Sequence, residues 1–172
     1  MIIFDIEANG LPHNVTTIHC VALYDTETGE THSYNDSGGQ PITTALTLIE
    51  DADVIIGHNI INYDLRVIKK IYGFFEPRGE VIDTLLLSKL YHPDMMETDK
   101  KMKWKDLPTK LYGRHSLKSY GYRFGVFKGD FGDDADWSEW SQEMEDYCRQ
   151  DVKVTTLVWH HFEKKLMTEN TK

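Results

Sequence analysis

Hydrophobic and polar residues alternate in the first segments of the chain, as they do in β-strands. In the opening segment I-I-F-D-I-E, the alternation predicts that Ile2, Phe4 and Ile6 share one face of a strand. A second strand is predicted over Thr16–Tyr24 and a third over Glu30–Tyr34, with the turn D-T-E-T-G between them. These three segments predict a meander of hairpins at the start of the fold.

Helical periodicity and short apolar runs follow the meander. Pro41 suits the first turn of a helix, and apolar residues recur at helical spacing as far as Glu50. The short apolar run Val54–Gly57 predicts a buried strand, and the segment after it predicts a helix that ends at Gly73. A last short strand at Val81–Ile82 is expected to lead directly into a further helix.

The second half of the chain is less regular. Little periodicity is present over His92–Arg114, which predicts a long irregular segment; a short helix over Ser116–Tyr122 and an acidic linker over 128–136 follow. The chain then predicts a helical region over Ser138–Leu166 and a polar tail from about residue 167. Strands first, and then strands alternating with helices, predict an α/β fold with a central mixed β-sheet flanked by helices, in one domain over 1–172.

Composition narrows the class of protein. With 40% hydrophobic and 27% charged residues, the chain has the composition of an ordinary globular domain. No run of about 18 apolar residues is present and the start shows no basic leader, so we expect a cytoplasmic protein without a membrane partner. If a phage encodes the chain, that compartment is the host cytoplasm. Cys20 and Cys148 lack metal-binding spacing and are expected to be reduced packing residues.

The net charge bears on the substrate. A formal charge of −9 argues against a protein that coats duplex DNA by electrostatics alone. It is compatible with a nucleic acid substrate, because bound cations reverse the sign of the field where acids cluster. Lysines and arginines also outnumber acids between Asp99 and Arg114, where Trp104 and Tyr112 are interleaved. We expect Trp104 to stack on a base, with packing against the body of the domain as the alternative.

Two acids interrupt the first predicted strand. Asp5 and Glu7 share the face opposite Phe4, so both carboxylates point the same way, about 6 to 7 Å apart. Two like charges at that spacing repel each other unless a cation lies between them. The pattern predicts a divalent metal site, and a solvent-facing strand with hydrated acids is the alternative.

Two later carboxylates stand near strand ends or on helix faces. Asp64 falls in the first turns of a predicted helix, where it can project toward the edge of the sheet. Tyr147 and Asp151 are four residues apart and therefore share one helix face. Each has a simpler interpretation: Asp64 as a helix cap, Asp151 paired with Lys153 or Lys165 on a hydrated face, and Tyr147 as a core aromatic.

Taken together, these acids form a recognisable set. The motifs D-I-E at 5–7, N-x-x-x-Y-D at 59–64 and Y-x-x-x-D at 147–151 resemble the three motifs of the DEDD exonucleases, in the tyrosine (DEDDy) subgroup. That family has a ribonuclease-H-like fold. The segments I-D-T-L-L-L-S-K-L, Y-G-Y-R-F-G and M-E-D-Y-C-R-Q-D-V are similar to the N-terminal proofreading domain of podophage DNA polymerases. The resemblance runs from Met1 to about Leu166 and fits either a free-standing nuclease or a fragment.

The resemblance implies a two-metal 3′ to 5′ exonuclease that uses Mg²⁺ or Mn²⁺. By this resemblance Asp5 bridges both ions, Glu7 and Asp151 complete one of them, and Asp64 supports the other. Tyr147 is expected to orient the attacking water. The implied reaction removes nucleoside 5′-monophosphates from the 3′ end of single-stranded DNA.

Further candidates surround these motifs. Gly10 and Leu11 follow the first motif, and the resemblance implies that such a leucine wedges against the terminal base, with ordinary packing as the alternative. Asn59 is a candidate substrate contact that could instead satisfy local backbone groups. Asp83 is predicted to cap a helix. His115 could contact substrate.

Three classes of function remain open on the sequence. The first is a 3′ to 5′ exodeoxyribonuclease, acting alone or proofreading for a DNA polymerase on another chain. The second is an exoribonuclease on the same scaffold, because the motifs do not distinguish deoxyribose from ribose in the substrate. The third is a non-catalytic module that binds single strands or docks a polymerase.

Overall fold

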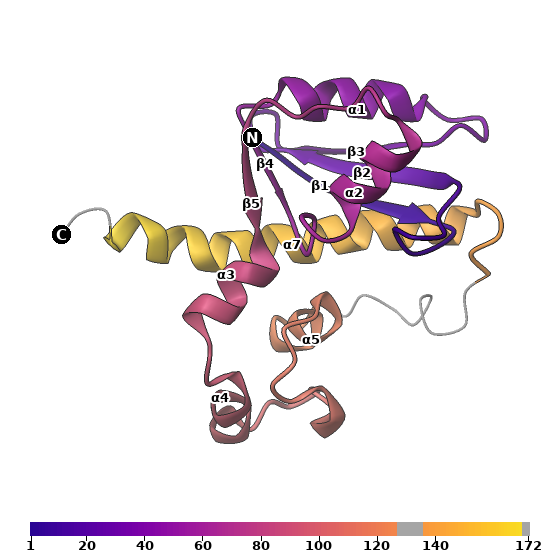
Figure 1. Cartoon of the computed structure of the whole chain (residues 1–172). Helices are drawn as coiled ribbons and strands as arrows, with labels where there is room; N and C mark the ends of the chain where they lie inside the picture. Colours follow the sequence, from indigo (N-terminus) through magenta and orange to yellow (C-terminus); the bar gives the residue numbers. More distant parts are fainter. Residues whose placement is uncertain (127–135, 170–172) are drawn as a thin grey trace.

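The computed structural model describes residues 1–126 and 136–169, which build a mixed five-stranded sheet with the order β3-β2-β1-β4-β5 (Figure 1). The strands are β1 (Ile2–Ala8), β2 (Ile18–Asp25), β3 (Glu30–Tyr34), β4 (Val54–Gly57) and β5 (Glu80–Asp83). The first three form the predicted antiparallel meander, whereas β4 pairs parallel with β1 and with β5. The predicted central mixed sheet is therefore confirmed.

Helices cover both faces of this sheet. The helices α1 (Ile42–Asp51) and α2 (Asp64–Ile71) pack on one face, and the long helix α7 (Gln142–Glu169) crosses the other (Figure 1). Phe4 belongs to the core beneath α1 and α2, whereas Ile3 belongs to the core beneath α7. The alternation predicted for the first strand is thus observed, and it directs Asp5 and Glu7 toward α7.

A helical segment leaves the sheet after β5 and forms the lower part of Figure 1. It comprises α3 (Thr84–Tyr91), α4 (Met95–Met102), the 3₁₀ turn η1 (Thr109–Leu111) and α5 (Leu117–Arg123). The prediction of an irregular segment over 92–114 is wrong, because α4 and η1 lie within it. Only Met95 and Asp99 are buried in α4, so the helix carries almost no apolar periodicity from which it could be predicted.

The boundaries of the last helix and the linker also differ from expectation. The helix α7 begins at Gln142 and not at Ser138, and the Oγ atom of Ser141 accepts a hydrogen bond from the N–H of Met144 at this end. The predicted acidic linker over 128–136 lies outside the described residues except for Asp136. None of the helices in the part of the chain that the structure describes is long and apolar enough to span a membrane.

Candidate active site

The two acids of β1 lie beneath α7 at the start of a cleft. Glu7 is only 8% exposed and Asp5 is half-buried, so the alternative of a hydrated strand surface is wrong. The register of β1 against β2 shifts between Glu7 and Ala8, whose partners are Cys20 and Ile18, so His19 of β2 is skipped as in a β-bulge. Bulges of this kind are common beside active sites because they redirect a side chain.

Asp64 enters the site from α2. Its side chain is 2% exposed, and its Oδ1 atom accepts a hydrogen bond from the backbone N–H of Ile6 at 3.2 Å. Tyr63 is the N-cap residue of α2, so the interpretation of Asp64 as the cap is wrong. The carboxylate instead joins the start of α2 to β1.

Burial gives Asp64 an unusual protonation equilibrium. The pKa of Asp64 is raised to about 7: burial is the largest cause, hydrogen bonds from backbone N–H groups lower the pKa, and the nearby charges of Asp83 and Asp151 raise it. A carboxyl group with such a pKa resists ionisation unless positive charge is brought near it. A divalent cation supplies that charge, so the environment of Asp64 fits a metal ligand.

Asp151 and Tyr147 reach the same cleft from α7. Asp151 is 6% exposed, so a hydrated helix face does not describe it. Tyr147 lies one turn earlier on the same face and is half-buried, and its ring meets the ring of Trp137 edge-on at 6.5 Å between centroids. The phenol is therefore at the wall of the cleft and not in the core.

The cleft has a volume of about 860 Å³, which is in the range of ligand pockets. It brings together eight of the nine predicted site residues, which line it from β1, the loop after β1, the loop before α2, α2 and α7: Asp5, Glu7, Gly10, Leu11, Asn59, Asp64, Tyr147 and Asp151. The exception is Trp104, which is not among the lining residues and whose indole N–H donates to Asp99 Oδ1 at 2.9 Å. This contact fits the alternative that Trp104 packs against the body of the domain.

The loop after β1 holds its backbone firmly and exposes one side chain. The Oδ1 atom of Asn14 accepts from the N–H of Leu11 at 2.8 Å, and the hydroxyl of Tyr63 donates to the carbonyl of Gly10 at 2.8 Å. A Cβ atom at Gly10 would lie 2.8 Å from the same Asn14 oxygen, so a larger residue does not fit without movement. Leu11 is 57% exposed, which excludes ordinary core packing for its side chain.

A further buried carboxylate, Asp83, organises the loop between β4 and α2. Asp83 caps α3 as predicted, because it accepts from the N–H of Leu85, and it also accepts from the N–H groups of Asn59 and Ile61. These three bonds fix Asn59 with a φ of 67°, in the left-handed region. The backbone N–H of Asn59 is therefore satisfied by the Asp83 side chain, and the residue lines the cleft.

Sequence reasoning missed Cys148 as a neighbour of the acids. Single ligand atoms of Asp5, Glu7 and Cys148 all lie within 4.8 Å of one another. Burial raises the pKa of the Cys148 thiol, so it is protonated at neutral pH and donates toward Asp5, with Sγ 3.4 Å from the carbonyl and 3.7 Å from Oδ2. The available signal was its position three residues before Asp151, on the same helix face.

Comparison with known proteins places the chain in a family. Residues 2–162 match the family model described as RNase_H superfamily, and the chain belongs to this superfamily. The chain is 35% identical, over 90% of its length, to the DNA-directed DNA polymerase of Enterobacteria phage T3. It is 36% identical over the same share to the enzyme of Escherichia phage T7. The aligned region spans 25% of each of these relatives, that is, about a quarter of their length.

Solved structures agree with this family at the level of the fold. A nuclease in its apo form has a TM-score of 0.67 with 19% identity, and the match covers 98% of this chain and 74% of that chain. Exonuclease I has a TM-score of 0.61 with 15% identity, and the match covers 95% of this chain and 40% of that chain. The predicted ribonuclease-H-like fold is confirmed.

Proposed function

We propose that this domain is a metal-dependent exonuclease that hydrolyses single-stranded DNA from its 3′ end and releases nucleoside 5′-monophosphates. The observation that carries the proposal is the convergence of four carboxylates, from β1, α2 and α7, on one cleft together with a tyrosine. A module that only binds a polyanion has no use for such a concentration of negative charge. The arrangement therefore favours hydrolysis over the non-catalytic alternative.

The ligand set suits two hard divalent ions, Mg²⁺ or Mn²⁺. All four side chains offer carboxylate oxygen, which these ions prefer, and the nearby Cys148 is held as a neutral thiol by burial. The ions would be held by Asp5, Glu7, Asp64 and Asp151, which all line the cleft. When bound, the ions supply Lewis acidity to the phosphate and positive charge for the leaving 3′ oxygen.

Protein groups direct the nucleophile. Tyr147 presents its hydroxyl from the wall of the cleft, one turn before Asp151. We propose that this hydroxyl and the carboxylate of Glu7 orient the attacking water in line with the bond that breaks. We propose that the exposed Leu11, in the loop after β1, contacts the terminal base. The turn at Asn59 lines the same cleft.

The relatives support DNA as the substrate, because both are described as DNA-directed DNA polymerases. We propose that the domain acts either alone or as a proofreading nuclease for a DNA polymerase on another chain, in the cytoplasm of a phage-infected host. Its matched region corresponds to about a quarter of those polymerases.

The proposal is tested by digesting single-stranded DNA that carries a label at one end. A 3′ label should be released first as a mononucleotide, and a 5′ label should yield a ladder that shortens progressively. Both should require Mg²⁺ or Mn²⁺ and fail with Asp5→Asn, whereas the exposed control Glu27→Gln should act like the parent. Faster cleavage of a matched RNA would assign the domain to RNA, and cleavage in a chelator would refute the metal mechanism.

A further inference from the structure

One wall of the cleft, formed by α3 and by the turn before α5, presents basic side chains that have no role in the proposed hydrolysis. Lys89 of α3 and the consecutive residues Arg114 and His115 line the same cleft as the four carboxylates. The chain has 19 lysines and arginines against 28 acids, so three basic side chains gathered on one wall of the cleft run against its overall charge. Their placement indicates an anionic ligand group beside the metal site.

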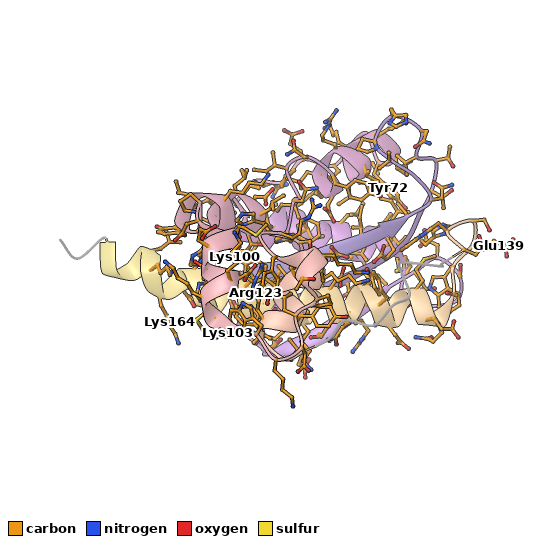
Figure 2. The ribbon with its side chains drawn as sticks, turned by 90° about the horizontal axis from the view of Figure 1, so that it is seen from below. Tyr72, Lys100, Lys103, Arg123, Glu139 and Lys164 are labelled. Carbon is orange, nitrogen blue, oxygen red and sulfur yellow. The ribbon has the colours of Figure 1, made fainter. Side chains whose placement is uncertain are left out.

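A buried ion pair fixes the turn that carries two of these residues. Asp99 is fully buried and accepts from Arg123 Nε at 2.9 Å and Arg123 Nη2 at 2.7 Å; the Arg123 side chain is 4% exposed. The pair holds the turn from both sides, because Gly113 N–H donates to Asp99 Oδ2 and Arg123 Nη2 donates to the Arg114 carbonyl, each at 2.8 Å. Figure 2 labels Arg123 within this helical segment, whereas Glu139 lies at the far right of the view.

A hydrogen-bonded chain sets the tautomer of His115. Within the described residues, the one hydrogen-bond partner of the buried Tyr120 hydroxyl is Ser88 Oγ, and Ser88 Oγ also lies 2.6 Å from His115 Nδ1. Burial raises the pKa of Tyr120, so the phenol keeps its proton and donates it to Ser88. Ser88 then donates to Nδ1, and the remaining nitrogen, Nε2, carries the hydrogen of the imidazole.

The three side chains therefore present hydrogen-bond donors only: an ammonium group, a guanidinium group and an imidazole N–H. Phosphate oxygens are acceptors only, and most contacts that proteins make with nucleic acids are to the phosphates and sugars. Only the terminal nucleoside lies on the 3′ side of the linkage that is hydrolysed, and no further phosphodiester follows it. Every other phosphate of the strand in the cleft therefore belongs to the 5′ side.

We infer that Lys89, Arg114 and His115 form a subsite for a backbone phosphate of the single strand, on the 5′ side of the linkage that is hydrolysed. This inference rests on the proposed exonuclease function. A strand has a second phosphate that can bind at this subsite, whereas a mononucleotide ester has none. The subsite therefore favours polymers over mononucleotide esters. Trp104 contributes indirectly, through its hydrogen bond to Asp99, by supporting the turn.

Two substrates distinguish the role of this subsite from that of the hydrolytic residues. The p-nitrophenyl ester of thymidine 5′-monophosphate contains the hydrolysed linkage and no further phosphate. Oligothymidylate contains the hydrolysed linkage and further phosphates on its 5′ side. Lys89→Ala, Arg114→Ala and His115→Phe should each raise KM for oligothymidylate about tenfold, the effect of one charged or strong hydrogen bond. Hydrolysis of the ester should stay within about twofold of the parent.

Two controls accompany these variants. Arg78→Ala removes a positive charge that is 79% exposed and paired with Asp51, outside the cleft, and it should leave both substrates unaffected. His115→Gln restores an N–H donor near the position of Nε2, so it should recover part of the affinity that His115→Phe loses. Recovery by Gln would separate a donated hydrogen bond from simple packing of the ring.

Each outcome decides the inference. Equal losses on the ester and the oligonucleotide, or no loss on either, would overturn it. If the parent protein hydrolyses neither substrate, the proposed function fails, and the anisotropy of fluorescent oligothymidylate then measures binding directly. In that case weaker binding by the three variants than by Arg78→Ala would still support the phosphate subsite, and equal binding would refute it.

Discussion

The carboxylate of Asp64 accepts a hydrogen bond from the backbone N–H of Ile6, so the first residue of α2 is attached to β1 between the two acids of that strand. One contact thus aligns acids that are separated by 57 to 59 positions in the sequence, Asp64 with Glu7 and with Asp5. The same contact buries a carboxyl group, and this has measurable consequences for pH and metal binding.

Stability of the metal-free protein should fall as pH rises from about 4 to about 7. The pKa of Asp64 is about 7 in the folded state, against the ordinary value of 3.8 for an aspartate in the unfolded chain, so the folded state binds the proton more tightly and loses that advantage as the group ionises. Asp64→Asn should flatten this part of the pH dependence. Urea unfolding of both proteins in chelator, at pH 5 and pH 8, measures it; parallel curves would contradict the assignment.

Removal of the Asp5 charge should abolish activity and slightly stabilise the metal-free protein. Asp5→Asn keeps the shape of the side chain, relieves repulsion with Glu7 and removes the charge of a proposed metal ligand, so the rate should fall by several powers of ten. Single-turnover digestion and thermal melting in chelator test both parts. A marked drop in melting temperature would indicate a structural role for Asp5.

Tyr147→Phe should slow turnover without weakening metal binding. The change removes one hydroxyl and keeps the ring that contacts Trp137, so the rate should fall roughly 10- to 1000-fold, as for one positioned polar group. Asp151→Asn should instead raise the Mg²⁺ concentration needed for half-maximal rate. Titration of Mg²⁺ in a single-turnover assay distinguishes the two, and a Phe variant as fast as the parent would remove Tyr147 from the mechanism.

Trp104→Phe should cost stability and leave the hydrolysis of a mononucleotide ester unchanged. The indole N–H donates to the fully buried Asp99, so its loss leaves a buried carboxylate with one hydrogen bond fewer, at a cost of about 1 to 3 kcal/mol. Urea unfolding measures this cost. If stability were unaffected while the affinity for single strands fell more than tenfold, Trp104 would be a stacking residue, as the sequence first indicated.

The site was predictable where a local pattern carries it. The alternation in β1 placed Asp5 and Glu7 on one face, and the four-residue spacing placed Tyr147 beside Asp151. The helix α4 was not predictable, because its single buried acid, Asp99, satisfies partners 5, 14 and 24 residues later in the chain.

Contacts between residues that are distant in the sequence could not be predicted, for a related reason. Nothing near His115 in the sequence indicates that Ser88 and Tyr120 would fix its tautomer, since the three residues meet only after α3 and α5 pack. The predicted contact of Trp104 with substrate rested on an aromatic residue among lysines. That pattern does not reveal whether the indole faces solvent or a buried acid.

The position of α7 has a consequence for synthesis of the protein. The ribosome synthesises the chain from the N-terminus. The strand with Asp5 and Glu7, and the loop that leads to Asp64, therefore emerge long before α7, which crosses the face of the sheet opposite α1 and α2. A nascent chain that ends before Gln142 carries three of the four acids and neither Tyr147 nor Asp151. The proposed site is thus completed by α7, and translation must pass Asp151 before all of its residues are present.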